Sequence, residues 1–163
     1  MMRTKEQHGI APVFDEKSRI LILGSFPSVA SRAEGFFYGH PRNRFWRVLS
    51  AVFGEAVPST VEEKKALLLK HGVALFDVLA ECEIEGSSDS SITGATPNDL
   101  SPILSRGNIE RIFVNGKTAE RLYNKYLKQK TGLSAVVLPS TSPANAAWSE
   151  ERLLAAWQEI QRR

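Results

Sequence analysis

Two kinds of hydrophobic pattern alternate along the chain. Continuous apolar runs that end in glycine or serine occur at residues 19–24 (RILILG), 111–116 (RIFVNG) and 134–140 (SAVVLPS). Their β-branched and leucine content predicts strands. The lack of polar alternation in residues 19–24 indicates that both faces of this strand are buried, as in the centre of a parallel sheet, and residues 111–116 read as a second buried strand. Apolar residues at helical spacing predict helices over about residues 43–53, 60–72, 117–128 and 149–163.

This alternation of strands and helices predicts one α/β domain over residues 1–163, with a parallel sheet between helices. Thr60 and Ser149 are placed to cap the second and last of these helices. Residues 73–79 (VALFDVL) fit either a short strand or a helical turn. The sequence turns polar between residues 81 and 102, and residues 85–102 (EGSSDSSITGATPNDLSP) predict a long loop, which is a frequent place for function and also for simple mobility.

Composition narrows the class of protein only slightly. Hydrophobic residues make up 42% and charged residues 24% of the 163 residues, as in ordinary globular proteins. The formal net charge of +3 is compatible with a polyanionic partner. The single cysteine, Cys82, has no metal-ligating neighbour at a useful spacing and reads as a plain thiol in a cytoplasmic protein. No apolar run reaches the roughly 18 residues of a membrane span, so we expect no membrane contact.

Three short polar segments follow the predicted strands. In an α/β sheet, ligands bind beyond the carboxyl ends of the strands, which is where residues 24–28 (GSFPS), 115–117 (NGK) and 139–145 (PSTSPAN) fall. Each segment is also compatible with an ordinary turn, strand end or helix cap. None has the spacing of a phosphate-binding P-loop or of a dinucleotide fingerprint.

The stretch FFYGHPRNRFW, residues 36–46, gathers aromatic and cationic side chains. Phe45 and Trp46 continue the apolar stripe of the following helix, so we expect them in the core. Tyr38, followed by glycine, is better placed at a pocket wall. Asn43 lies between two arginines at the start of the predicted helix, where anions are favoured.

Two further side chains are possible participants in chemistry. His40 has the features of an acid, a base or a phosphate donor, although a surface histidine beside proline is more common. Asp77 lies in an apolar run, where an unpaired carboxylate is costly to bury, and it could equally cap a helix or a turn. No nucleophilic triad and no metal-ligand spacing is evident in the sequence.

Taken together, LGSFPS, FYGHPRNRFW and LPSTSPAN resemble the signature segments of the uracil-DNA glycosylase superfamily. The resemblance is greatest to the hypoxanthine-DNA (deoxyinosine) glycosylase branch and includes ALFDVLAECEIEGSSDSSI, so that it extends from about Gly9 to Trp157. It implies a three-layer α/β/α fold with a central, mostly parallel four-stranded sheet. It also implies excision of a base that has been flipped out of the DNA helix.

The resemblance also implies roles for individual residues. Uracil-specific relatives carry Asp or Asn in the first loop to position water, whereas this chain has Phe26, so Asn43 is the expected catalytic substitute and Asp77 the reserve. Tyr38 is expected to stack on the flipped base. The expected base-binding residues are Gly24, Ser25, Phe26, Pro27, Tyr38 and Asn115. The expected DNA-binding residues are Ser28, His40, Arg42, Arg44, Ser140, Thr141, Ser142, Pro143 and Asn145.

The implied activity is a DNA-repair hydrolase that leaves an abasic site. The three signature segments LGSFPS, FYGHPRNRFW and LPSTSPAN contain no lysine that could form a Schiff base. A monofunctional glycosylase is therefore expected rather than a lyase. No metal or organic cofactor is implied, and the partner is double- or single-stranded DNA with a damaged base, bound by a monomer. Two alternatives stay open: a mismatch-specific uracil or thymine glycosylase, and a catalytically silent domain that binds DNA or nucleotides.

Overall fold

A four-stranded parallel sheet forms the centre of the computed structural model, which describes residues 3–162. The strand order is β3-β2-β6-β7, and the strands are β3 (Val73–Asp77), β2 (Ile20–Gly24), β6 (Arg111–Asn115) and β7 (Ala135–Leu138). Every residue of β2 and β3 is buried, which is what an uninterrupted apolar run requires. The parallel sheet is thus confirmed, and residues 73–77 form one of its two edge strands rather than a helical turn.

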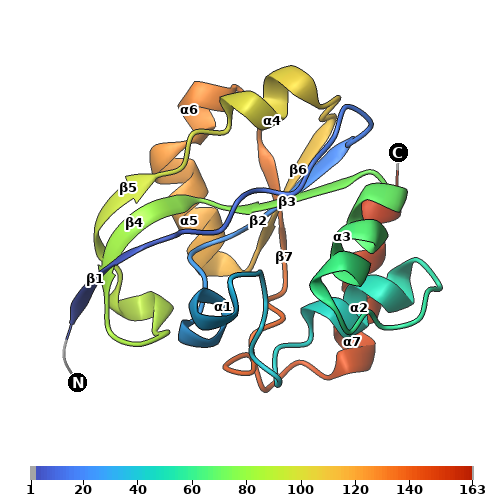
Figure 1. The fold of residues 1–163 in the computed structure, drawn as a ribbon, viewed down its shortest axis with the longest axis horizontal. Coiled ribbons are helices and arrows are strands. Elements are labelled where there is room, and N and C mark those ends of the chain that lie inside the picture. The colour runs from blue at the N-terminus through green and yellow to red at the C-terminus, as the bar shows by residue number, and fades with distance from the viewer. Residues whose placement is uncertain (1–2, 163) are drawn as a thin grey trace.

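Helices lie on both sides of this sheet (Figure 1). On one side are α2 (Phe45–Val52), α3 (Val61–Lys70) and α7 (Glu150–Trp157), and on the other is α5 (Lys117–Tyr126). Shorter helices occupy the connections: α1 (Val29–Glu34), α4 (Ser101–Arg106) and α6 (Lys128–Thr131). The three-layer α/β architecture expected from the sequence is confirmed. No helix of the described chain is long and apolar enough to span a bilayer.

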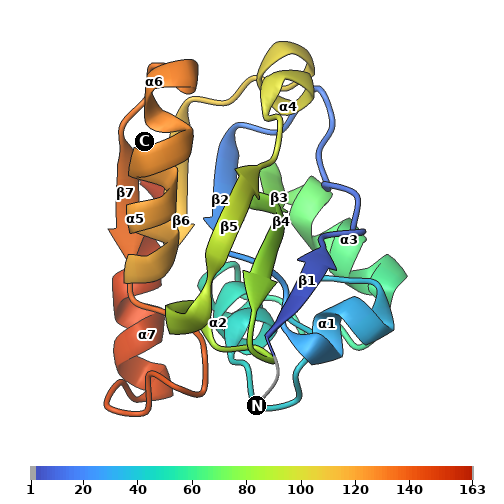
Figure 2. The same ribbon diagram turned by 90° about the vertical axis from the view of Figure 1, so that its left-hand side faces the viewer.

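A second, antiparallel sheet lies on the α5 side of the molecule (Figure 2). Its strand order is β1-β4-β5, with β1 (Thr4–Gln7), β4 (Leu79–Ile84) and β5 (Thr93–Pro97). The predicted loop over residues 85–102 is therefore wrong, because it contains a 3-10 turn over Asp89–Ser91, β5 and the start of α4. β5 (TGATP) consists of small and polar residues with a glycine and a proline, so no strand pattern marks it, whereas residues 81–84 of β4 (ECEI) do alternate polar and apolar side chains.

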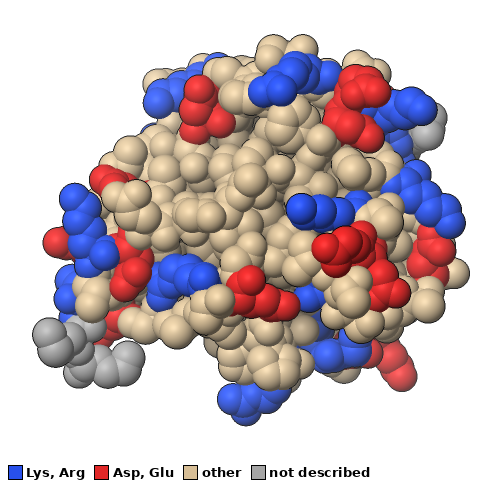
Figure 3. Space-filling view, viewed as in Figure 1, with Lys and Arg blue, Asp and Glu red and all other residues tan. Residues whose placement is uncertain are grey.

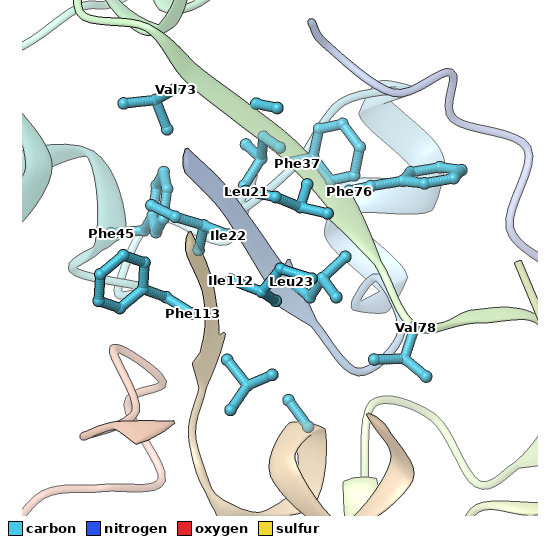
Figure 4. Close-up of a cluster of buried hydrophobic side chains, with 14 of the residues drawn as sticks. Leu21, Ile22, Leu23, Phe37, Phe45, Val73, Phe76, Val78, Ile112 and Phe113 are labelled. Atoms are coloured by element: carbon cyan, nitrogen blue, oxygen red, sulfur yellow. The ribbon is translucent and has the colours of Figure 1, made fainter. Parts of the chain in front are cut away.

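The core gathers around β2, β3 and β6. Figure 4 shows Leu21, Ile22 and Leu23 at its centre, with aromatic rings arranged around them. Phe45 is fully buried and Trp46 is 5% exposed, so their predicted core position is confirmed. The Trp46 indole N–H donates to the carbonyl oxygen of Phe37 at 3.1 Å, and this bond ties the segment that precedes α2 to the helix.

The predicted helix caps are present. The Thr60 side chain accepts from the backbone N–H of Glu63, whose carboxylate accepts in return from Thr60 N–H, a complete capping box. Ser149 accepts from Arg152 N–H at the start of α7. Helix α2 begins at Phe45, so Asn43 precedes it, and a 3-10 turn over Gln158–Gln161 follows α7.

Candidate active site

A cavity of about 340 Å³ opens at the carboxyl edge of the parallel sheet. The arrowheads of β2, β6 and β7 point toward this edge in Figure 2. The walls of the cavity come from the last residues of β2, β3 and β6 and from the segments that follow β2 and β7, together with residues 37–43 and 87–89. Segments distant in sequence therefore meet at one place, as expected for a parallel sheet.

Most of the predicted site residues line this cavity. They are Gly24, Ser25, Phe26, Pro27, Ser28, Tyr38, His40, Asn43, Asp77, Asn115, Ser140, Thr141, Ser142 and Pro143. Three predicted residues are not among its lining residues, namely Arg42, Arg44 and Asn145. Five lining residues were not singled out from the sequence: Ser31, Phe37, Ser87, Asp89 and Ala144.

A chain of hydrogen bonds runs through the cavity wall. Asn115 Nδ2 donates to Thr141 Oγ1 at 3.0 Å, and Thr141 Oγ1 in turn donates to Asn43 Oδ1 at 2.8 Å. The backbone N–H of Thr141 donates to Asn115 Oδ1 at 3.1 Å. Thr141 is fully buried, so these bonds are shielded from water and hold both amides firmly.

This chain fixes the orientation of the Asn43 carboxamide. Asn43 Oδ1 accepts from the Thr141 hydroxyl and also from the backbone N–H of Phe45 at 2.9 Å. A rotated amide would place its NH₂ group against the Phe45 N–H, donor against donor. The carbonyl oxygen is therefore occupied, and the amide N–H donors of Asn43 are the groups offered to a ligand.

Tyr38 is a rigid part of the wall. Its ring stacks on Phe45 with a centroid distance of 4.0 Å and an interplanar angle of 14°. Its hydroxyl accepts from Asn115 Nδ2 at 3.2 Å, and its backbone φ of 54° is in the left-handed region. Burial, followed by the negative charge of Asp77, raises the pKa of Tyr38 far above its usual range, so the phenol stays neutral.

Asp77 is paired with His8, which the sequence did not single out. His8 Nε2 lies 2.8 Å from Asp77 Oδ2, and both side chains are buried. His8 Nδ1 accepts from the backbone N–H of Ile10 at 3.1 Å, so the ring is a neutral imidazole whose proton is on Nε2. Asp77 is thus the acceptor in this bond, and the bond offsets part of the free-energy cost of burying its carboxylate.

Gly24 allows Asp77 to approach β2. A Cβ atom at Gly24 would lie 2.4 Å from Asp77 Oδ1 and 2.9 Å from the Tyr38 hydroxyl. Only a residue without a side chain fits between these groups. Gly24 therefore both ends β2 and leaves room for the Asp77 carboxylate and the Tyr38 hydroxyl in the cavity wall.

Asp89 brings a second carboxylate into the cavity. Ser25 Oγ donates to Asp89 Oδ1 at 3.0 Å. Burial raises the pKa of Asp89 to about 6, and the negative charge of Asp77 contributes to this rise. The sequence offered no signal for Asp89, because it lies in a serine-rich turn of the segment expected to be a plain loop.

The two arginines that flank Asn43 differ in environment. Arg44 is half-buried, and its guanidinium donates to the carbonyl oxygens of Ser142, Asn145 and Trp148. It therefore holds the loop after β7, and its predicted phosphate contact is unsupported because these donors are used within the protein. Arg42 is exposed beside the cavity and remains available to a phosphate. Asn145 supports the same loop by donating to the Ser140 carbonyl oxygen.

Outside the cavity, three further features bear on function: the surface charges, the cysteine and possible metal ligands. On the face shown in Figure 3, basic and acidic side chains are interspersed, in line with the small net charge. Cys82 is buried in β4, and burial raises the pKa of its thiol to about 11. Among residues 3–162, no three His, Cys, Asp or Glu side chains gather closely enough to hold a metal ion.

The fold and the cavity define a three-layer α/β protein whose binding site lies at the carboxyl edge of a parallel sheet, with oriented amides and carboxylates in its wall. The profile of the Uracil DNA glycosylase superfamily matches residues 11–161, and the chain belongs to this superfamily.

Similar proteins agree with this assignment. A Hypoxanthine DNA glycosylase from Methanosarcina acetivorans is 38% identical over 148 residues, covering 90% of this chain and 92% of that protein. A Hypoxanthine DNA glycosylase from Methanosarcina barkeri is 32% identical over 160 residues, covering 97% and 99%. The solution NMR structure of a candidate uracil DNA glycosylase from M. acetivorans superposes with a TM-score of 0.79 at 33% identity, covering 98% of this chain and all of that one.

Proposed function

We propose that this protein is a monofunctional DNA glycosylase that hydrolyses the N-glycosidic bond of a flipped hypoxanthine and leaves an abasic site. Two relatives that align over almost their whole length carry the name Hypoxanthine DNA glycosylase. The observation that carries the proposal is the cavity with the oriented Asn43 amide, in a chain whose first loop has Phe26 where uracil-specific relatives have Asp or Asn. Its volume of about 340 Å³ is in the range of small-molecule sites.

Asn43 is proposed to act on the leaving base. As the C1′–N9 bond breaks, its electron pair moves onto the purine, and a fixed N–H donor stabilises the charge that develops there. The amide is already oriented by Thr141 and Phe45, so no reorganisation is needed at the moment of reaction. Because the Asn43 carbonyl oxygen is occupied, positioning of water falls to another group.

Asp77 is proposed to act on the sugar side. Its carboxylate is held by His8, with Oδ1 beside Gly24 in the cavity wall. A negative charge there favours the oxocarbenium-like transition state and orients a water whose oxygen bonds to C1′. The water loses one proton and the departing purine takes one up, so the products are free hypoxanthine and an abasic deoxyribose.

The other residues are proposed to hold the DNA and the flipped base. Tyr38 and Phe26 supply aromatic walls for the base. Exposed Pro143, at the tip of the loop after β7, is placed to fill the gap that the base leaves. Ser28, His40, Ser140 and Ser142 are proposed as polar contacts to the DNA backbone, with Arg42 as the cation. No lysine is among the described cavity residues, so no side chain there could form a Schiff base, which fits a monofunctional hydrolase; we propose that it works as a monomer.

The test is excision from duplex oligonucleotides that contain a single inosine or a single uracil, followed by cleavage at abasic sites. We expect the wild type to act on inosine and Asn43→Ala to lose about 100- to 1,000-fold in single-turnover rate, the usual loss for one such donor. Asn43→Asp is the matched variant, because it keeps an oxygen for Thr141 and Phe45 and replaces only the N–H donors.

The outcomes separate the parts of the proposal. Equal rates for wild type and Asn43→Ala would remove Asn43 from the mechanism. A fully active Asn43→Asp would show that the amide donors are not needed. Cleavage at uracil without cleavage at inosine would overturn hypoxanthine as the substrate and retain the glycosylase activity. Binding of both duplexes without abasic sites would reduce the protein to a DNA-binding domain.

A further inference from the structure

The turn between β4 and β5 is fastened to the wall of the cavity. Ser25 Oγ donates to Asp89 Oδ1 at 3.0 Å, and the Val29 backbone N–H donates to Ser87 Oγ at 2.9 Å. Arg32 Nη2 donates to the Gly86 carbonyl oxygen at 3.1 Å. These three contacts join the antiparallel sheet to the first loop and to α1. They fix the position of Asp89 within the cavity wall.

Only one oxygen of the Asp89 carboxylate has a hydrogen-bond partner among the described residues. Oδ1 accepts from Ser25, whereas no described residue donates to Oδ2. Asp89 is among the lining residues, so the unused oxygen belongs to the cavity wall. Asp89 is half-buried and its Oδ2 is open to solvent in the cavity, so a ligand N–H would take the place of water as its hydrogen-bond donor.

We propose that Asp89 accepts a hydrogen bond from the ring N–H of the flipped base and thereby recognises a deaminated base. This inference rests on the glycosylase function proposed above. Deamination turns an amino-substituted ring, whose neighbouring nitrogen is an acceptor, into a carbonyl beside a ring N–H. Hypoxanthine therefore offers a donor at N1, where adenine offers an acceptor. An ionised carboxylate only accepts, so it bonds the N1–H of hypoxanthine and repels the N1 lone pair of adenine.

The same contact does not exclude every base with a ring N–H. Guanine carries the N1–H and a 2-amino group, so its exclusion falls to the cavity walls and to the greater cost of opening its pair with cytosine. Asp89 thus separates hypoxanthine from adenine, its precursor, and uracil from cytosine. This is the distinction that an enzyme acting on deaminated bases must make in undamaged DNA.

The charge state of Asp89 suits an acceptor at neutral pH. Burial raises its pKa to about 6, so at pH 7 the ionised form exceeds the protonated form by about ten to one. The other charged groups that act on it are Asp77 at the end of β3 and Arg121 on α5, while Tyr38 and His40 line the same cavity. If Asp89 must be ionised, inosine excision declines as the pH falls below about 6.

The test measures single-turnover excision from inosine duplexes between pH 5 and 8 for wild type, Asp89→Asn and Asp89→Ala. We expect the wild-type rate to fall at the acid end, and Asp89→Asn to lose this decline together with about tenfold of its rate at pH 7. Asp89→Ala should lose about 10- to 100-fold. Glu83→Gln is the matched control, because it removes an exposed carboxylate of β4 that is not among the cavity residues, and it should behave as wild type.

A second readout is selectivity, measured as the ratio of inosine to adenine excision. We expect this ratio to fall in Asp89→Asn, whose amide presents either a donor or an acceptor to the base. An unchanged ratio and pH profile in Asp89→Asn would overturn the role of Asp89 while hypoxanthine excision by the wild type stands. If the wild-type rate fell as the pH rises above 6 and both Asp89 variants lacked this fall, Asp89 would be a proton donor and its role as an acceptor would be overturned. A wild type that releases no base at any pH would overturn the proposed function itself.

Discussion

Replacing Thr141 by valine tests whether the orientation of Asn43 matters for catalysis. The change retains the shape of the side chain and removes the hydroxyl that accepts from Asn115 at 3.0 Å and donates to Asn43 at 2.8 Å. Neither partner is left without any bond, because Asn115 Nδ2 still donates to Tyr38 and Asn43 Oδ1 still accepts from Phe45. The two lost bonds are worth about 0.5–1.5 kcal/mol each, so we expect the free energy of unfolding to fall by about 1–3 kcal/mol.

The effect on catalysis follows from the same bond. If the bond from Thr141 to Asn43 contributes about 0.5–1.5 kcal/mol to holding the amide, its loss slows excision by about two- to tenfold. The assay is the single-turnover rate on an inosine duplex, well below the melting temperature of each variant. Thr141→Ser keeps the hydroxyl and should restore most of the rate. A Thr141→Val protein as fast as wild type, or a Thr141→Ser protein as slow as Thr141→Val, would refute an amide oriented through Thr141.

Three other predictions concern charge and space around the cavity. Arg42→Gln should weaken DNA binding and reduce the salt dependence of log Kd by about one, whereas Arg44→Gln should lower the melting temperature without changing that slope; equal slopes for both variants would contradict the distinction. Gly24→Ala would place a Cβ atom 2.4 Å from Asp77 Oδ1, so excision should fall about 100-fold while circular dichroism shows a folded protein. Because burial raises the pKa of Asp89 from 3.8 to about 6, the folded state binds its proton more tightly, and the free energy of unfolding should decline as pH rises through this window. Asp89→Asn should lack this component of the decline in denaturant titrations.

The sequence was most informative where local chemistry and fold agree. The buried strands at 20–24 and 111–115 were predicted because their apolar runs are uninterrupted, and the capping residues Thr60 and Ser149 because a helix start needs a side-chain acceptor. Asn43 and Thr141 were placed near one site because their segments belong to the carboxyl edge of one sheet. Their direct hydrogen bond could not be predicted from the sequence, since it joins residues 98 positions apart.

What the sequence did not show depends on contacts between distant, unremarkable residues. His8 precedes the first predicted strand and acquires meaning only through its bond to Asp77, 69 positions later. Asp89 lies in a serine-rich turn before β5, a strand of small and polar residues, so neither that strand nor the cavity wall produced a pattern. Arg44 resembled a phosphate ligand because sequence cannot tell an exposed guanidinium from one that donates to the carbonyl oxygens of a folded loop.

The most direct test of the central claim is to quantify free base released from an inosine-containing duplex. After incubation with the wild-type protein, mass spectrometry should find hypoxanthine in an amount equal to the abasic sites formed, and Asn43→Ala should release at least 100-fold less per unit time. A wild-type protein that binds this duplex and releases no hypoxanthine would contradict the account.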